Sequence, residues 1–153
     1  MASSGDVEVT GGDDELGLMN EYRDLFFLEV KEHLATVNDS LLAYENSPED
    51  KSHIDELFFF VHTIKSSSAM MGFDDLSIVS HQMEDIFDLA RNGVSIPSEV
   101  IDLFFRVFDE IEAYIAKAEK GEEEKLDCAA SVKEIQDYFT SNKPKVVESS
   151  GGV

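Results

Sequence analysis

Residues 54–71, IDELFFFVHTIKSSSAMM, carry the apolar spacing that decides the fold. Apolar or small residues recur there in steps of three and four, at Ile54, Leu57, Val61, Ile64, Ser68 and Met71. This spacing places them along one face of an α-helix, whereas a half-buried strand would show strict alternation. The stretch therefore predicts a helix that buries one side against other helices.

Three further stretches of the chain repeat this helical spacing. Their apolar positions are Phe27, Val30, Leu34, Val37, Leu41 and Tyr44; Leu76, Val79, Met83, Ile86 and Ala90; and Ile101, Phe104, Phe108, Ile111, Ile115 and Ala118. Residues 47–50 interrupt the pattern, Gly72 and Gly93 suit left-handed helix ends, and Pro97 suits a first turn. Short links force consecutive helices to run antiparallel, so the sequence predicts an all-α, up-down-up-down four-helix bundle.

A weaker helical pattern follows from Leu126 to Phe139. Its apolar face consists of Ala129, Val132, Ile135 and Phe139. We expect this fifth helix to pack outside the bundle. Residues 1–14 and 143–153 are rich in glycine, serine and charged residues, which predicts flexible tails, or a linker at the carboxyl end, on either side of one folded domain at residues 15–142.

The composition excludes several classes of partner. With 33 acidic and 12 basic residues the net charge is -21, which repels nucleic-acid phosphates and anionic lipid. The longest apolar run, residues 57–61, is far shorter than the roughly 20 residues of a membrane span. The chain has one cysteine and no basic residue within residues 1–14 that could begin a signal peptide. We therefore expect a cytoplasmic protein that binds neither nucleic acid nor membrane.

Two residue pairs on neighbouring predicted helices form the candidate site. His62 follows the core residue Val61, about 100° further around the helix, and should be reachable from solvent. Lys65 lies one turn further along the same face. The next helix carries His81 and Glu84 with the same spacing, so that a hydrogen bond between His62 and Glu84 is geometrically allowed.

Such a pair suits phosphoryl chemistry. A carboxylate that accepts from Nδ1 of an imidazole leaves the Nε2 lone pair free as a nucleophile. Glu84 would stabilise the charge that develops on the ring, Lys65 would offset the charge of the phosphoryl oxygens, and His81 could extend the network. The sequence has no glycine-rich phosphate loop and no paired-cysteine zinc spacing, so we expect the phosphoryl donor and acceptor sites on other domains or proteins.

These motifs resemble those of the histidine phosphotransfer (HPt) family. The stretch His62-Thr63-Ile64-Lys65, with the small residues and Gly72-Phe73 that follow it, is similar to the family's phosphorylation motif, and residues 81–84 are similar to its supporting motif. The likeness is strongest to the amino-terminal phosphotransfer domain of chemotaxis histidine kinases, and it covers roughly residues 18–140 by pattern reading. One departure is Ser66, which stands where the family usually has glycine.

The resemblance implies a function, partners and residue roles. His62 would accept a phosphoryl group from a histidine kinase catalytic domain and pass it to an aspartate of a response-regulator receiver domain. Glu84 would be its Nδ1 partner, Lys65 a phosphoryl-side cation and His81 a network member. The chain would need no cofactor of its own, since ATP and Mg²⁺ would be bound by the partner kinase and Mg²⁺ by the receiver. We expect a monomeric carrier, either free-standing or the first domain of a kinase.

Two other functions stay open at this point. Four histidines and many carboxylates could serve a metal-binding four-helix bundle, but di-metal bundles use two Glu-x-x-His pairs, and this chain shows the reversed order instead, as from His81 to Glu84. A helical adaptor that is no longer phosphorylated is the second alternative.

The remaining side chains of interest have simpler interpretations. We expect His33 and His53 at core boundaries, and Cys128 as a small residue on the fifth helix. Met70, Met71 and Met83 are predicted to fill the core. In the run Phe58-Phe59-Phe60 at least one ring must face outward or lie under the fifth helix, for packing or for docking.

Overall fold

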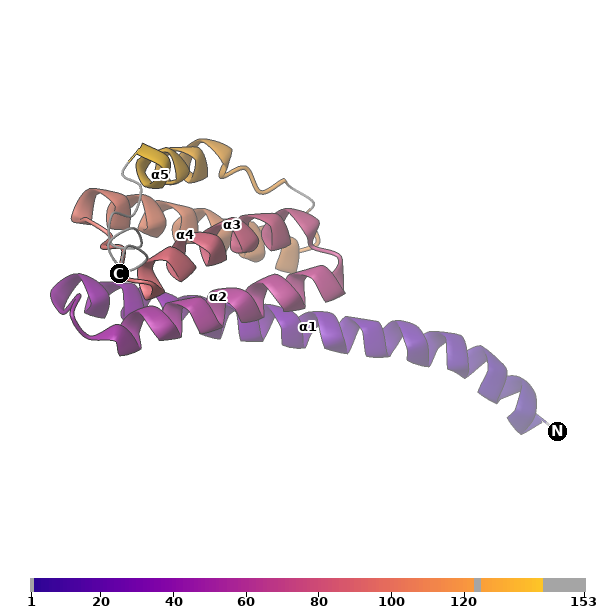
Figure 1. Cartoon of the computed structure of the whole chain (residues 1–153). Helices are drawn as coiled ribbons and strands as arrows, with labels where there is room; N and C mark the ends of the chain where they lie inside the picture. Colours follow the sequence, from indigo (N-terminus) through magenta and orange to yellow (C-terminus); the bar gives the residue numbers. More distant parts are fainter. Residues whose placement is uncertain (1, 123–124, 142–153) are drawn as a thin grey trace.

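A computed structural model describes residues 2–122 and 125–141, with side chains described from residue 15 onward. Its elements are α1 (Ala2–Asn46), α2 (Lys51–Met71), α3 (Asp74–Arg91), α4 (Ser98–Glu119) and α5 (Ala129–Ser141). Consecutive helices reverse direction, as Figure 1 shows, and no strand occurs among the described residues. The predicted all-α bundle with an additional fifth helix is confirmed.

The turn residues end the helices as the sequence predicts. Asp50 caps α2, because its carboxylate accepts a hydrogen bond from the Ser52 backbone N–H at 3.0 Å. At the other end of α2, Gly72 takes a left-handed conformation with φ of 81°, and its N–H donates to the Ala69 carbonyl at 3.2 Å. These caps fix where α2 begins and ends, and hence where its polar residues lie.

The core lies where the four apolar seams meet. Every seam position predicted in α1, α3 and α4 is buried, and in α2 only Met71 is half-buried. The rings of Phe87 and Phe104 stack at a centroid distance of 4.7 Å and join α3 to α4. The Tyr44 hydroxyl accepts a hydrogen bond at 3.0 Å from the Ile96 N–H, which ties the α3–α4 link to α1. Packing of the seams thus fixes the alignment of α2 and α3 along their lengths.

Helix α5 lies outside the four-helix bundle, as predicted. It packs against α4 and α3 (Figure 1), and Val132, Ile135 and Phe139 are buried there. The prediction for Ala129 was wrong, since this residue is exposed at the first position of α5. Cys128, which precedes the helix rather than lying on it, is buried instead.

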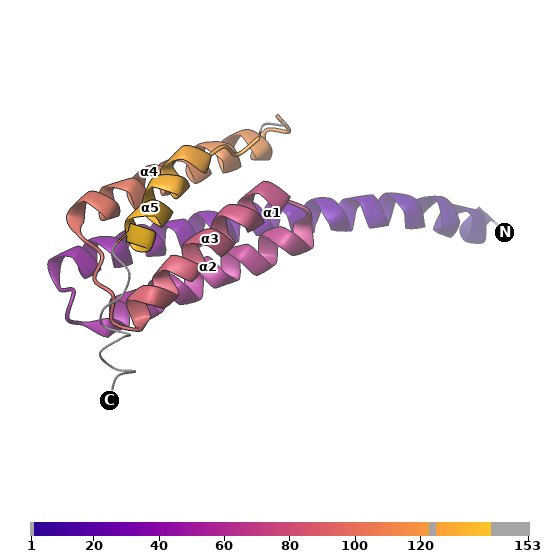
Figure 2. The same ribbon diagram turned by 45° about the horizontal axis from the view of Figure 1, so that its top comes forward.

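Helix α1 is longer than the predicted domain. It begins at Ala2 and extends well past the ends of the other helices (Figure 2), so residues 2–14, expected as a tail, are helical. Packing of the apolar seam forms the later part of α1. Each residue added to a helix that is already formed gains one backbone hydrogen bond without a further nucleation cost. That this stretch is flexible stays a prediction, and the predicted tail at residues 143–153 lies outside the described residues.

None of the helices in the described part of the chain combines the length and the apolar character that crossing a bilayer requires.

Candidate functional site

The candidate site lies on the outer surface where α2 packs against α3. Its histidine, His62, comes one residue after the buried Val61, and 51% of the His62 side chain is exposed. Glu84 follows the buried Met83 on α3 and is itself buried, with 9% of its side chain exposed. The seams of the two helices therefore set an accessible imidazole beside a buried carboxylate.

Both basic groups of the site contact the same carboxylate. His62 Nδ1 lies against Glu84 Oε2, and Lys65 Nζ donates a hydrogen bond to Glu84 Oε1 at 2.7 Å. The His62–Glu84 pair agrees with the geometry that the sequence allowed. The Lys65–Glu84 bond goes beyond the sequence prediction, which assigns Lys65 only to the phosphoryl side.

The electrostatics of the site keep Glu84 ionised. Burial alone raises the pKa of this carboxyl, but the hydrogen bonds and charges of Lys65 and His62 outweigh burial and lower its pKa below the ordinary value. An ionised carboxylate can only accept hydrogen bonds, so the proton of the His62–Glu84 contact belongs to Nδ1. The Nε2 atom of a neutral His62 then carries the free lone pair and is the atom left for nucleophilic chemistry.

His81 is placed differently from the other three predicted residues. Its side chain is 62% exposed, and its Nε2 lies 3.8 Å from Asp85 Oδ1, one turn further along α3. Within the described part of the chain no hydrogen bond joins His81 to His62, Lys65 or Glu84. The structure thus brings together three of the four predicted site residues.

Sequence reasoning missed a group of side chains next to His62. The Phe58 ring lies nearly parallel to the His62 ring at a centroid distance of 6.2 Å. The Arg91 guanidinium of α3 lies 4.3 Å from the centre of the Phe58 ring, and its Nε is 3.3 Å from Asp55 Oδ1. The only sequence signal is that Asp55, Phe58 and His62 follow helical spacing, which does not reveal the partner on α3.

The rest of the phenylalanine run faces other surroundings. Phe59 is 60% exposed, which confirms that one ring faces outward. The Phe60 ring packs against the His33 ring on α1, with 5.1 Å between the ring centroids. The core-filling prediction was wrong for Met70, which is 86% exposed and lies at the surface between α2 and α1. Met83 is buried as predicted.

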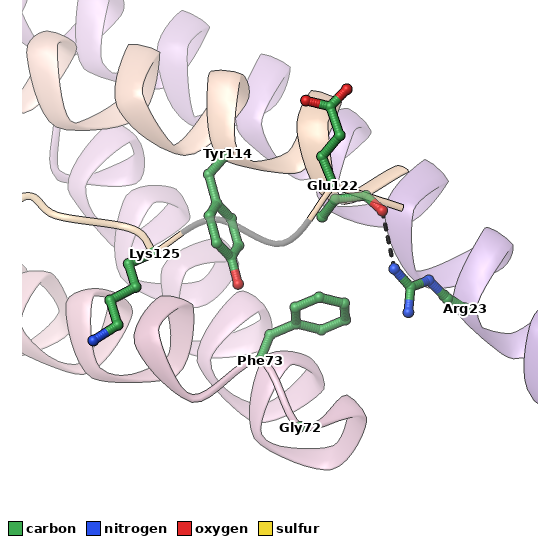
Figure 3. A pocket seen from close by; sticks show the side chains of 7 residues that line it. Arg23, Gly72, Phe73, Tyr114, Glu122 and Lys125 are labelled. Carbon is green, nitrogen blue, oxygen red and sulfur yellow. Dashed lines mark hydrogen bonds between the residues drawn. The ribbon is translucent and has the colours of Figure 1, made fainter. Parts of the chain in front are cut away.

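A separate pocket lies where α1, α4 and the α2–α3 turn meet (Figure 3). This hollow has a volume of about 420 Å³ and is lined by Arg23, Phe73 and Tyr114, among others. Arg23 donates a hydrogen bond to the Ala118 carbonyl at 2.9 Å, and its guanidinium lies 5.6 Å from the Phe73 ring centre. Arg23 therefore caps the end of α4 and attaches α1 to it. Neither His62 nor Glu84 borders this pocket.

The described residues do not favour a metal site or a reactive thiol. No three histidine, cysteine, aspartate or glutamate side chains gather there as they would around a metal ion. Cys128 is buried, and burial raises the pKa of its thiol, with a further contribution from Glu110. A thiol held protonated in this way is a poor nucleophile.

Comparisons with known proteins agree with this geometry. The model of the Hpt domain family matches residues 21–121. The chain is 37% identical over 112 residues to the chemotaxis protein CheA of Bacillus subtilis and 30% identical over 119 residues to CheA of Halobacterium salinarum, covering 72% and 77% of this chain. It spans only 17% and 18% of the length of these two relatives.

A solved structure gives the same result in three dimensions. The CheA phosphotransferase domain from Thermotoga maritima superposes with a TM-score of 0.61 at 38% identity, and the match covers 64% of this chain and 94% of that domain. The family match includes His62, Lys65 and Glu84. The resemblance read from the sequence is thereby confirmed, and the chain belongs to the Hpt domain family.

Proposed function

We propose that this chain is a phosphoryl carrier of a chemotaxis-type two-component system and that His62 is its phosphorylated residue. The donor is the catalytic domain of a histidine kinase, and the acceptor is an aspartate of a response-regulator receiver domain. One observation carries the proposal: the Nδ1 atom of His62 is occupied by an ionised carboxylate, while half of the side chain remains exposed.

In each transfer one bond to phosphorus forms and another breaks. The His62 Nε2 lone pair attacks the γ-phosphorus of ATP held by the kinase, the bond from that phosphorus to the ADP oxygen breaks, and ADP leaves. The imidazole gains positive charge, which the Glu84 carboxylate stabilises through the Nδ1–H. In the second transfer an aspartate oxygen of the receiver attacks the same phosphorus, and the N–P electrons return to Nε2.

ATP and Mg²⁺ belong to the partners in this proposal. The kinase binds both, and the receiver binds Mg²⁺. Lys65 lies one turn from His62 and can approach the phosphoryl oxygens if it exchanges its hydrogen bond with Glu84 for them. Ser66 is exposed one turn beyond His62, where an approaching domain would meet its hydroxymethyl group. We expect the carrier to act as a monomer in the cytoplasm.

Phosphorylation with a chemotaxis kinase core and radiolabelled ATP tests the proposal. We expect a label that is stable in base and labile in acid, and that is lost in His62→Gln. The matched control is His53→Gln on the same helix, where His53 lies 3.5 Å from Asp50 and away from Glu84. Labelling of His62→Gln at the wild-type level, or no labelling of the wild type by any active kinase core, would refute the proposal.

A further inference from the structure

A series of contacts joins the end of α3 to the His62 ring, on the turn of α2 that precedes this histidine. The two helices lie side by side and run in opposite directions (Figure 1). On α2, Asp55, Phe58 and His62 are spaced by three and four residues and share one face. On α3, Glu84 and Arg91 lie about two turns apart and also share a face. Because the helices are antiparallel, Glu84 meets His62, and Arg91 meets the turn with Asp55 and Phe58.

The contact with Glu84 does not by itself hold the plane of the His62 ring. It fixes the Nδ1 atom, but the ring can still rotate about this contact, since 51% of the side chain is exposed. The Phe58 ring lies beside the imidazole, with 12° between the ring planes and 6.2 Å between the centroids. Offset parallel rings at such a distance attract each other. Phe58 therefore restricts rotation of the imidazole plane.

Arg91 in turn holds the Phe58 ring. The carbon of its guanidinium lies 4.3 Å from the centre of that ring. Its Nε lies 3.3 Å from Asp55 Oδ1 and its Nη1 lies 3.9 Å from Asp88 Oδ1, so carboxylates from both helices orient the guanidinium. A planar guanidinium can stack on an aromatic ring while its edge pairs with carboxylates. The position of the Phe58 ring is thus fixed from α3.

Arg91 is not placed as a cation for the phosphoryl group. Its contacts within the described part of the chain are with Asp55, Asp88 and Phe58, and the two carboxylates offset its charge. An influence of Arg91 on His62 therefore passes through the Phe58 ring.

We propose that Arg91 is a positioning residue for His62. It holds the Phe58 ring beside the imidazole, and this keeps Nδ1 at Glu84 and leaves Nε2 open to a partner. The consequence for phosphoryl transfer rests on the proposed function, but the orientation of the ring does not.

NMR spectroscopy of the whole chain with isotope-labelled histidine tests the ring orientation. The His62 signals are identified by their absence in His62→Gln, and the shifts of the ring protons depend on the aromatic ring beside them. In Arg91→Gln we expect these shifts to move from the wild-type values toward those of Phe58→Leu. Circular dichroism should show the same helical content in all variants. The matched control is Arg106→Gln, which removes the same charge from an exposed position on α4 and should leave the His62 shifts unchanged.

Labelling kinetics test whether Arg91 acts through Phe58. The strength of a cation–π contact at a partly exposed site corresponds to about a two- to fivefold change in rate. We expect Arg91→Gln to slow phosphorylation of His62 by about this factor, and Arg106→Gln to label at the wild-type rate. In a double-mutant cycle, Arg91→Gln should cause no further slowing once Phe58 has been replaced by leucine.

Two results would overturn the proposal. The first is a set of His62 ring shifts in Arg91→Gln equal to those of the wild type. The second is that Arg91→Gln slows labelling by the same factor in the wild type and in Phe58→Leu, which would mean that Arg91 acts independently of Phe58. The NMR measurement needs no kinase. A chain that no kinase labels would therefore refute the proposed function, while the ring shifts would still decide this proposal.

Discussion

At the scale of single residues, Glu84 determines the state of the site. One oxygen of its carboxylate contacts His62 Nδ1 and the other accepts from Lys65, so one buried anion orients both basic side chains. An accessible histidine alone would interconvert between two tautomers. The charge of Glu84 favours the tautomer with Nε2 unprotonated, and this selects the atom that can attack phosphorus.

Replacing Glu84 should slow phosphorylation without unfolding the bundle. In Glu84→Gln the neutral side chain keeps its size but no longer provides an anion for both His62 and Lys65. We expect kinase-dependent labelling to slow by about 10- to 100-fold, by analogy with the loss of a carboxylate that orients a metal-binding histidine. Circular dichroism should show an unchanged helical content. Asp85→Asn, an exposed neighbour on α3, is the control and should label at the wild-type rate.

Replacing His81 should have little effect on labelling. Because His81 is exposed and lies near Asp85 rather than Glu84, His81→Gln removes no contact of the His62 site. We expect a labelling rate within about twofold of the wild type, a difference of less than about 0.5 kcal/mol in activation free energy. A tenfold loss would instead show that His81 joins the network when the kinase is bound, as the sequence had suggested.

The lowered pKa of Glu84 makes a prediction about acid stability. Because the folded pKa lies below the ordinary value of 4.5, the fold favours the ionised form, and this contribution is complete above about pH 4.5. It is lost as the pH falls from there through the folded pKa. The difference in Tm between the wild type and Glu84→Gln should therefore be constant near neutral pH and shrink below about pH 4.5. A difference that grows on acidification would mean that burial, not Lys65 and His62, controls this carboxyl.

The sequence could predict the site residues only as far as helical spacing reaches. His62 and Glu84 each occupy a position next to a seam residue, and this is enough to bring them together across two packed helices. The hydrogen bond from Lys65 to Glu84 depends on how a long side chain turns at its end, which spacing does not determine. The Arg91–Phe58 contact depends in addition on the register between α2 and α3.

At the scale of helices, the turn at Gly72 is the clearest agreement between sequence and structure. Its left-handed φ of 81° is a conformation that other residues rarely adopt, and the site helix ends there. The boundaries of α1 and α5 were less predictable. The end of a helix that packs on nothing, or that is only weakly amphipathic, is set by small differences in free energy that a sequence pattern does not resolve.

Two glycine substitutions should have opposite effects on stability. In Gly72→Ala the added methyl group meets no atom within 4 Å, so the cost is the left-handed backbone alone, about 1–2 kcal/mol. Gly17 also has open space but lies inside α1 without a positive φ, so Gly17→Ala should be neutral or slightly stabilising. Thermal unfolding checks both. A Tm for Gly72→Ala equal to that of the wild type would contradict the left-handed cap.

At the scale of the whole molecule, the balance of charge is one-sided. The chain has 33 acidic residues against 12 lysine and arginine residues, so at least 21 acidic groups have no lysine or arginine of their own. The ion pairs of the described residues lie largely at the surface, for example Lys31–Glu119 and Lys133–Asp137, where such pairs contribute little. Repulsion between carboxylates should therefore exceed the attraction of the surface ion pairs.

This imbalance predicts that added salt stabilises the fold. Raising NaCl from about 10 mM to about 100 mM shortens the screening length from about 30 Å to about 10 Å, which weakens repulsion between distant carboxylates more than it weakens short ion pairs. We expect Tm to rise by several degrees, corresponding to about 1 kcal/mol of unfolding free energy. The rise should be smaller in a variant that combines Asp39→Asn with Glu45→Gln, two exposed acids on α1. A Tm that falls as salt is added would mean that ion pairs outweigh the repulsion, and that the excess of acidic groups does not destabilise the fold.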